Sequence, residues 1–464
     1  MSEATGRWRW ATPASWVVFA VCAVVVLGST LTHDFRDESI AGDTGGHLMQ
    51  ALSLAYDSHS LNFDARDLER WKELGWAQEP VGMFFQRYDG DRWGVAKPYG
   101  YSLYLAPFIA VLGPVHGIAL GNTLLLAAMM LITILLLRTR YDGPVVPLLT
   151  GAFYLASYVY MYAFWVHSEL FLGLLTLIAF AGAVRFAQTE KAWWAVLSFA
   201  AIGFAGSEKG AYLALYAPIG IVMLWKARTW RLRIALPLVS LVVLAVAVLP
   251  YLRYSDWESF NPYGGDRYVV QNATPFAGGT TGFKATNYSG EDITLFIDSP
   301  VAGKLEAFGY TIAGRHTGML VYLPVALLLL IAALAHVRKA DAWGRAALLS
   351  VLGYIVFYAF FFPTNFFGGG QSLGNRYFLQ AAPAIIAMVV LMRLPRATVL
   401  WCSLIGIVLG VVLLLPQHER PQTAHVHIER TSAPQRLLPF EANQLTRHYF
   451  ECVKLNLGDV TACP

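Results

Sequence analysis

Charged residues are scarce in this sequence, and the shortage decides the class of the protein. Aspartate, glutamate, lysine and arginine make up 14% of the 464 residues, and hydrophobic residues make up 56%. A soluble globular protein carries about 25% charged residues. The composition therefore excludes a soluble protein and predicts an integral membrane protein.

Cysteines and clusters of arginine are also rare. The four cysteines are too few for a disulfide framework or a zinc site. Cys452 and Cys463 lie in a polar tail, where both a disulfide and two free thiols stay open. No arginine-rich stretch with interleaved aromatic residues occurs, which excludes nucleic acid as a partner. Inverted repeats, which many secondary transporters contain, are absent as well.

Long apolar runs dominate what is present. A membrane-spanning helix needs about 20 mostly apolar residues. This rule predicts about eleven spans, near 14–32, 117–137, 144–164, 168–187, 192–206, 210–225, 234–251, 316–335, 346–363, 377–392 and 397–416. We therefore expect an all-α polytopic membrane protein, with a transmembrane domain at 1–416 and a short tail at 417–464.

The basic residues follow the positive-inside rule if the N-terminus is cytoplasmic. The inner connections then contain Arg7, Arg9, Arg138, Arg140, Arg185, Lys191, Lys226, Arg228, Arg231, Arg233, Arg338, Lys339, Arg345, Arg393 and Arg396. The outer segments 33–116, 252–315 and 417–464 carry most of the acidic residues. The first apolar segment lacks a convincing cleavage site, so we expect an uncleaved span. About eleven spans from a cytoplasmic N-terminus then place the C-terminus on the non-cytoplasmic side.

An acidic cluster follows the first span. Asp43 lies near the start of the stretch 42–57, whose apolar residues recur at helical spacing and predict a short amphipathic helix at the membrane surface. Further titratable residues lie close by in the sequence, namely Asp34, Asp37, Glu38 and His47. Each alone fits a solvated acidic loop, but a cluster held beside a bilayer favours a functional site.

The first outer segment ends in a basic residue and a short apolar run. Lys97 precedes Pro98 and is a candidate to bind an anion. The apolar run 101–112 is too short to cross a bilayer, and proline and glycine interrupt it, which predicts an interfacial or re-entrant helix. The middle outer segment, 252–315, is rich in glycine, asparagine, threonine and aromatic residues, and we expect a small mixed cap there.

Charged residues at the outer ends of spans are costly and so need a reason. His167 and Glu169 stand at the start of the fourth span, where a carboxylate either caps the helix or serves a site. Lys209 lies in a tight outer turn, against the positive-inside trend. There it either binds a phosphate or reaches to the membrane surface as an ordinary turn residue.

A glycine-rich segment leads into the tenth span. It runs from 368 to 377 and contains Gln371 and Arg376. Glycines let the backbone approach a ligand, and a helix N-terminus beside an arginine favours an anion. We therefore prefer a phosphate site here to a plain glycine-rich turn.

Together these features predict carboxylates and cations around one outer cavity. Such a set suits glycosyl transfer from a polyprenyl-phosphate sugar, in which Lys97, Lys209 and Arg376 hold the leaving phosphate. Asp43 then takes the proton of the acceptor hydroxyl in an inverting displacement. A divalent metal ion also fits beside the acidic cluster, although no ligand spacing requires one.

The order of these motifs resembles the GT-C glycosyltransferases, in particular the protein O-mannosyltransferase and lipid A aminoarabinose transferase branch. Residues 42–57 resemble the catalytic aspartate and juxtamembrane helix of that family. Residues 97–99 resemble its Lys-Pro-Pro segment, with Tyr99 in place of the second proline, and 207–210 resemble its Thr-Lys-Gly turn. The segments 317–324 and 368–377 are similar to segments of bacterial members.

The resemblance implies a GT-C-like bundle with juxtamembrane helices in a bacterial inner (plasma) membrane. It implies Asp43 as the base, Lys209 and Arg376 at the donor phosphate, and Glu169 as a second catalytic residue, either a supporting or an acceptor-side acid. The implied partners are a polyprenyl-phosphate sugar, membrane lipid, and a lipid, glycan or protein acceptor. The family usually has a second acidic residue beside the catalytic one; here acidic residues at 34–38 precede it, so the identity of the base stays open.

Two other functions stay open. A transporter or flippase of lipid-linked envelope precursors would show charged residues near mid-span and discontinuous helices. An O-antigen-ligase-like enzyme with a diphosphate-linked donor would use arginines and a histidine of a large outer loop. The candidates for that second function are Arg253, Arg267, Arg315 and His316.

Overall fold

The chain folds into a bundle of helices with a small sheet at one end. The computed structural model describes residues 13–37, 42–56, 61–63, 65–75, 83–87, 93–254, 267–270, 285–288, 301–363, 366–368, 374–418 and 432–441. The helices of the bundle are α1 (Pro13–Thr32), α4 (Gly100–Leu137), α5 (Val145–Tyr154), α6 (Glu169–Thr189), α7 (Ala192–Glu208), α8 (Ala211–Lys226), α9 (Trp230–Tyr254), α10 (Val301–Ala313), α12 (Pro324–His336), α13 (Ala342–Phe361), α15 (Ala382–Leu391) and α16 (Arg396–His418).

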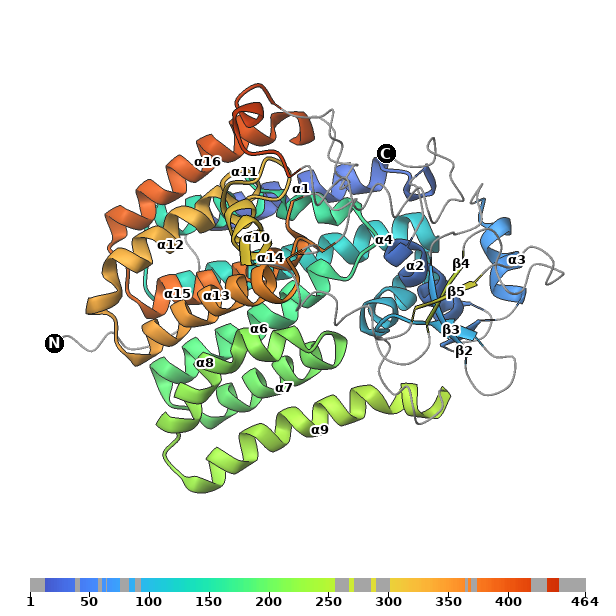
Figure 1. Ribbon diagram of the computed structural model, residues 1–464, viewed down its shortest axis with the longest axis horizontal. Coiled ribbons are helices and arrows are strands. Elements are labelled where there is room, and N and C mark those ends of the chain that lie inside the picture. The colour runs from blue at the N-terminus through green and yellow to red at the C-terminus, as the bar shows by residue number, and fades with distance from the viewer. Residues whose placement is uncertain are drawn as a thin grey trace.

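Shorter elements complete the described chain. They are the helices α2 (Gly42–Ala55), α3 (Ala65–Glu73), α11 (Met319–Tyr322) and α14 (Arg376–Leu379), the 3-10 helices η1 (Phe35–Asp37), η2 (Tyr158–Phe164), η5 (Val337–Lys339) and η6 (Gln435–Leu437), and the strands β1 (Asn62–Phe63), β2 (Phe84–Arg87), β3 (Trp93–Val95), β4 (Arg267–Val270) and β5 (Ala285–Tyr288). In Figure 1, α2, α3 and the strands lie together beyond one end of the bundle.

Six of the described helices are long and apolar enough to cross a membrane: α1, α4, α6, α9, α13 and α16. The bent pair formed by α5 and η2, with 55° between its halves, makes a seventh if it counts as one span. The other predicted spans coincide with helices of fewer than 18 residues or with two short helices in series. The count of about eleven spans therefore stays a prediction, whereas the class of helical membrane protein is confirmed.

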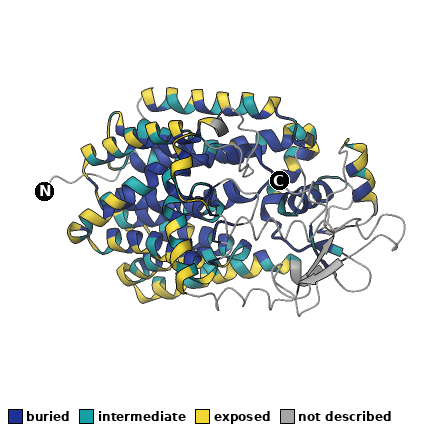
Figure 2. Ribbon diagram, turned by 45° about the horizontal axis from the view of Figure 1, so that its top comes forward, coloured by how far each residue is buried: buried dark blue, intermediate teal, exposed yellow. Residues whose placement is uncertain are grey.

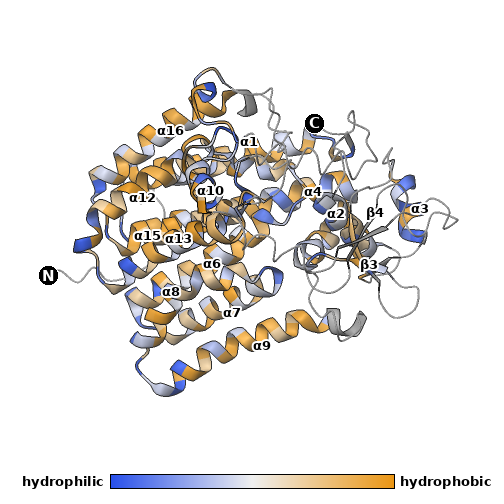
Figure 3. Ribbon diagram, in the orientation of Figure 1, coloured by the Kyte–Doolittle hydropathy of each residue, from blue (hydrophilic) through white to orange (hydrophobic). Residues whose placement is uncertain are grey.

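The outer helices turn apolar side chains outward. On α9, Leu238, Leu241, Val242, Val246 and Leu249 recur at helical spacing, and each is more than half exposed. Figure 2 shows such exposed faces around the bundle, and Figure 3 shows that these helices are largely hydrophobic. Since exposing apolar surface to water costs about 25 cal/mol per Å², these faces suit lipid.

The turns predicted to be cytoplasmic lie together at one end of the bundle. There Gln188 donates a hydrogen bond to Thr139, and Arg228 pairs with Glu190. Glu169 begins α6 at the opposite end, and a helix of 21 residues is about 30 Å long. The basic turns and the predicted site are therefore separated by about the thickness of the hydrocarbon core of a bilayer.

The sheet joins the first and middle outer segments. Its antiparallel strands follow the order β1-β3-β2-β4-β5, and β2 pairs with β4 with Phe85 opposite Tyr268. The predicted mixed cap thus contributes two strands, while the first outer segment contributes three that were not predicted. Strands of two to four residues are too short to show an alternating pattern.

The helix α2 is not the surface helix that its amphipathic spacing predicted. Its residues from Thr44 to Ser53 are all buried, because α4 and the strands cover it. Small residues allow this close packing, since a Cβ added at Gly46 would lie 3.0 Å from Val95 Cγ1 of β3. The helix is therefore an internal support of the site.

The long helix α4 is a hairpin of two helices that folds back at Gly113. Gly113 has φ 76° and ψ 168°. The two arms touch, because Tyr101 donates from its hydroxyl to Asn122 Oδ1 at 2.8 Å and Tyr104 donates to the carbonyl of Gly121. The prediction of a separate re-entrant or interfacial helix at 101–112 agrees with this fold.

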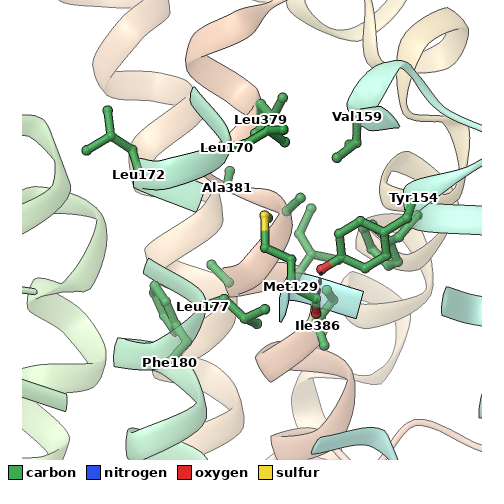
Figure 4. Packing of buried hydrophobic residues seen from close by; sticks show 14 of the residues in the cluster. Met129, Tyr154, Val159, Leu170, Leu172, Leu177, Phe180, Leu379, Ala381 and Ile386 are labelled. Carbon is green, nitrogen blue, oxygen red and sulfur yellow. Dashed lines mark hydrogen bonds between the residues drawn. The ribbon is translucent and has the colours of Figure 1, made fainter. Parts of the chain in front are cut away.

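Beneath the site, the second arm of α4 packs against α6 and α15. Figure 4 shows Met129 among Leu170, Leu177, Leu379 and Ile386, with the ring of Tyr154 beside it. The Tyr154 hydroxyl bonds to Thr133 at 2.8 Å. This core fixes the ends of α6 and α14, which carry residues of the predicted site.

The bend at Gly113 generates a stability prediction. Its backbone angles lie in a region that is open essentially to glycine alone and costs other residues about 1–3 kcal/mol. No heavy atom lies within 4 Å of a Cβ added there, so Gly113→Ala tests backbone strain alone. We expect the variant to lose about 1–3 kcal/mol of stability, measured by thermal unfolding in detergent.

Gly353→Ala is the matched control for this variant. It also adds a Cβ in open space, but within α13 at ordinary helical angles, where alanine is favoured over glycine by about 0.5–1 kcal/mol. Equal melting temperatures for the two variants would contradict the proposed role of Gly113.

Candidate active site

Asp43 forms the centre of the candidate site. It lies in the first turn of α2, directly after Gly42, whose φ of 60° turns the chain into the helix. The free N–H groups of a first turn favour a carboxylate. Asp43 Oδ1 lies 2.6 Å from Lys97 Nζ, and Oδ2 lies 3.0 Å from Arg376 Nη2. The structure thus brings together three residues that the sequence singled out.

The sheet positions Lys97. The residue follows β3, and the pairing of β2 with β3 continues as Ala96 N donates to the Phe84 carbonyl at 2.8 Å. The Lys97 ammonium lies 5.0 Å from the centre of the Phe84 ring, a cation–π distance. Strand pairing and the ring together direct the amine toward Asp43.

Arg376 uses each side of its guanidinium. Nη2 donates to Asp43, Nη1 donates to His167 Nε2 at 2.9 Å, and Nε lies 3.8 Å from Glu169 Oε1. Asn375 caps the short helix α14 by accepting from Phe378 N. A planar group with several fixed donors suits such a position better than a lysine.

The predicted glycine-rich segment supports Arg376 and leaves room for it. A Cβ at Gly368, which has φ 97°, would clash with Arg376 Cγ. Gly374, with φ 65°, lies against Tyr322 and Tyr158. In the described part of the segment, glycine therefore serves the packing of the arginine and its neighbours.

His167 lies between Arg376 and Glu169. An arginine can only donate, so the Nε2 that faces Arg376 is the acceptor and the proton sits on Nδ1. That Nδ1 lies 3.5 Å from Glu169 Oε1. The ring is held by Trp165, whose centroid is 4.4 Å away and whose Nε1 donates to Thr44 Oγ1.

Lys209 lies behind this cluster. It follows the last residue of α7, and its amine sits 3.4 Å from the centre of the Tyr377 ring. Burial lowers the pKa of Lys209 to about 7, although the charge of Glu169 acts in the opposite direction. Lys209 therefore gains or loses its charge near neutral pH.

The cations decide the charge of Asp43. Burial alone raises the pKa of this carboxyl, but Lys97 and Arg376 more than offset it and hold the pKa well below its usual range. Burial lowers the pKa of His47 to about 4, and burial beside Arg376 lowers that of His167. At neutral pH the site holds ionised Asp43 and two neutral imidazoles.

The other predicted supporting residues lie elsewhere or outside the described residues. The Tyr99 hydroxyl donates to the carbonyl of Ala247, which ties the first outer segment to α9. Asp34 forms a partly exposed pair with Arg36. The side chain of Asp37, and all of Glu38 and Gln371, lie outside the described residues.

The residues named for a diphosphate-linked donor have another task where they are described. The Arg315 side chain donates to the carbonyls of Arg436 and Leu438, and the backbone N–H of His316, rather than its imidazole, donates to Glu441. They hold the tail segment 432–441 against the start of α11. The side chains of Arg253 and Arg267 lie outside the described residues.

Asn122 and Trp165 support the candidate site through contacts for which the sequence analysis gave neither residue a role. Asn122 Nδ2 donates to the carbonyls of Ala163 and Trp165 and so fixes the approach to His167. An asparagine within an apolar run is itself a signal, because such a position is costly without partners. Within the described chain, no three histidine, cysteine or acidic side chains are grouped to hold a metal ion.

The fork of contacts at Arg376 generates a second prediction. Arg376→Lys keeps the charge but cannot reach Asp43, His167 and Glu169 together. Because hydrogen bonds to charged groups contribute about 1.5–3 kcal/mol, we expect a clear fall in melting temperature in detergent. Arg231→Lys, at an exposed position near the start of α9, is the control and should melt as the wild type does; a matching melting temperature for Arg376→Lys would refute the contact set.

The comparisons with known proteins bear on the GT-C resemblance, which rests on short motifs. The geometry described above brings most of those motifs into one cluster, but similar clusters arise on unrelated folds. Comparison of the chain with protein-family models, with curated proteins and with solved structures gives no match, so the site itself has to carry the functional argument.

Proposed function

We propose that the protein transfers a glycosyl group from a polyprenyl-phosphate-linked sugar to a cell-envelope acceptor, with inversion, on the non-cytoplasmic face of a membrane. The observation that carries this proposal is the Asp43 carboxylate set between Lys97 and Arg376 at one end of an apolar bundle. A base and two phosphate-binding cations within contact distance suit a reaction in which a hydroxyl attacks and a phosphate leaves.

The charges of the site suit such a donor. With Lys209 protonated and Glu169 ionised, the three cations Lys97, Lys209 and Arg376 oppose two carboxylates, which leaves one positive charge. A polyprenyl-phosphate sugar is a phosphodiester with one negative charge, so its binding neutralises the cluster. Neutralising a buried charge is favourable, because an unpaired charge in an apolar setting is costly.

The charge stays balanced through the reaction. The acceptor oxygen forms a bond to the anomeric carbon while the bond from that carbon to the phosphate oxygen breaks. The bonding pair leaves with the phosphate, which gains one negative charge, and the acceptor proton passes to Asp43, which loses one. Arg376 and Lys97 stabilise the charge that develops on the phosphate.

The position of the cluster supports an enzyme over a transporter. Glu169, Lys209 and Arg376 stand at helix ends on the same side of the bundle, so the polar groups face one side. A transporter places its binding site near the membrane midplane. We therefore favour an enzyme that meets donor and acceptor from one face, and we infer that this is the face opposite the basic turns.

The proposal predicts the effect of Asp43→Asn on transfer. General-base catalysis contributes about 10²–10⁴-fold, so we expect a loss of that size in kcat at an unchanged membrane level of protein. The assay supplies purified protein in lipid nanodiscs with labelled polyprenyl-monophosphate sugars, and with diphosphate-linked sugars in competition.

Glu190→Gln is the control, because it removes an ion-paired acid at the opposite end of the bundle, and it should keep full activity. Full activity of Asp43→Asn would sink the assignment. Transfer from the diphosphate donors alone would favour the ligase-like function instead.

The pKa of Lys209 predicts a pH dependence of binding. The protonated amine binds phosphate, so affinity falls as the pH rises through about 7. In Lys209→Arg the charge persists at every pH. We expect the ratio of the dissociation constants of wild type and Lys209→Arg for undecaprenyl phosphate to rise between pH 6 and 8.5; the ionisation of the ligand itself cancels in this ratio, and a constant ratio would exclude Lys209 from the phosphate site.

A further inference from the structure

Both oxygens of Asp43 are engaged by cations. Oδ1 faces Lys97 Nζ at 2.6 Å and Oδ2 faces Arg376 Nη2 at 3.0 Å. A carboxylate held in this way is a weak base, and the same two cations keep its pKa well below the usual range. In the state described, the residue that should accept the acceptor proton is therefore poorly suited to do so.

The same two cations are the ones that a donor phosphate needs. Lys97 and Arg376 come from segments far apart in the sequence, and Asp43 bridges them. The Asp43 side chain is 18% exposed, against 11% for Lys97 and 13% for Arg376. The carboxylate is thus the most exposed member of the trio.

Arg376 can exchange one anion for another without leaving its place. Nη1 and Nε face His167 and Glu169, and these contacts do not involve Asp43. Only Nη2 has to change partner. Lys97 has a flexible chain and a single charged end, so its amine can follow the stronger anion.

We propose that Asp43 occupies the seat of the donor phosphate in the resting protein, and that the phosphate displaces it from Lys97 and Arg376. The displaced carboxylate then faces the acceptor as a stronger base, because an opposite charge no longer stabilises its ionised form. This inference rests on the proposed function and adds an order to it: the donor binds before the acceptor is activated. In the absence of donor, Asp43 stays bound to Lys97 and Arg376 and does not take a proton from water or from the acceptor.

The proposal makes a counterintuitive prediction for binding. If Asp43 competes with the phosphate, removing its charge should tighten the binding of a polyprenyl phosphate, although it slows transfer. We expect Asp43→Asn to bind undecaprenyl phosphate about tenfold more tightly than the wild type. In the wild type, only the fraction of molecules in which Asp43 has left the two cations can bind the phosphate, and the apparent affinity is lowered in proportion to that fraction. Lys97→Gln and Arg376→Gln should both weaken binding.

The experiment titrates undecaprenyl phosphate into purified protein in nanodiscs of zwitterionic lipid at pH 7.5. Binding is followed by tryptophan fluorescence, for which Trp165 beside His167 is a reporter, and by native mass spectrometry. Glu190→Gln and Lys191→Gln are matched controls at the opposite end of the bundle and should bind as the wild type does. Asp43→Ser replaces Asp43→Asn if the latter fails to fold.

The outcomes separate this inference from the proposed function. Wild type and Asp43 variants that all fail to bind undecaprenyl phosphate would overturn both. Binding that requires Lys97 and Arg376 but is unchanged or weaker in Asp43→Asn and Asp43→Ser would keep the phosphate site and overturn the displacement. Tighter binding in the Asp43 variants, with weaker binding in Lys97→Gln, supports both.

Discussion

One carboxylate shared by two cations holds the site together. Asp43 comes from α2, Lys97 from the chain after β3, and Arg376 from the start of α14. Taking charged groups out of water costs several kcal/mol for each ion, and their mutual attraction offsets this only while all three stay in place. The buried α2, the hairpin of α4 and the sheet therefore act as one support for two short contacts.

The arrangement also divides the charges of the bundle between its ends. Lys191 and Lys209 mark the two ends of α7, and Arg185 and Glu169 mark those of α6. The basic turns are numerous and include exposed residues such as Lys191 and the buried Arg185, whereas the charged groups of the site are few, buried and paired with charges of opposite sign. A membrane favours this division, because charge inside its apolar layer needs partners.

Most residues of the site could be predicted from the placement of charges in the sequence. The features that depend on long-range packing, such as the burial of α2, could not. Glu169, Lys209 and Arg376 stand beside apolar runs, where an ionised side chain is costly and so attracts attention. The burial of α2 depends on partners such as β3, and no local pattern reveals them. The contact of Tyr99 with α9 and the joining of two outer segments in one sheet are likewise long-range, and strands of two to four residues leave no period to detect.

The shared sheet sets the order in which the protein can mature during its synthesis. Lys97 follows β3, β3 pairs with β2, and β2 pairs with β4, which the ribosome makes only after α9. Arg376 emerges later still. Nascent chains inserted into the membrane thus hold Asp43 and Lys97 without Arg376, so a prematurely released fragment lacks the second cation on Asp43 and has no finished centre.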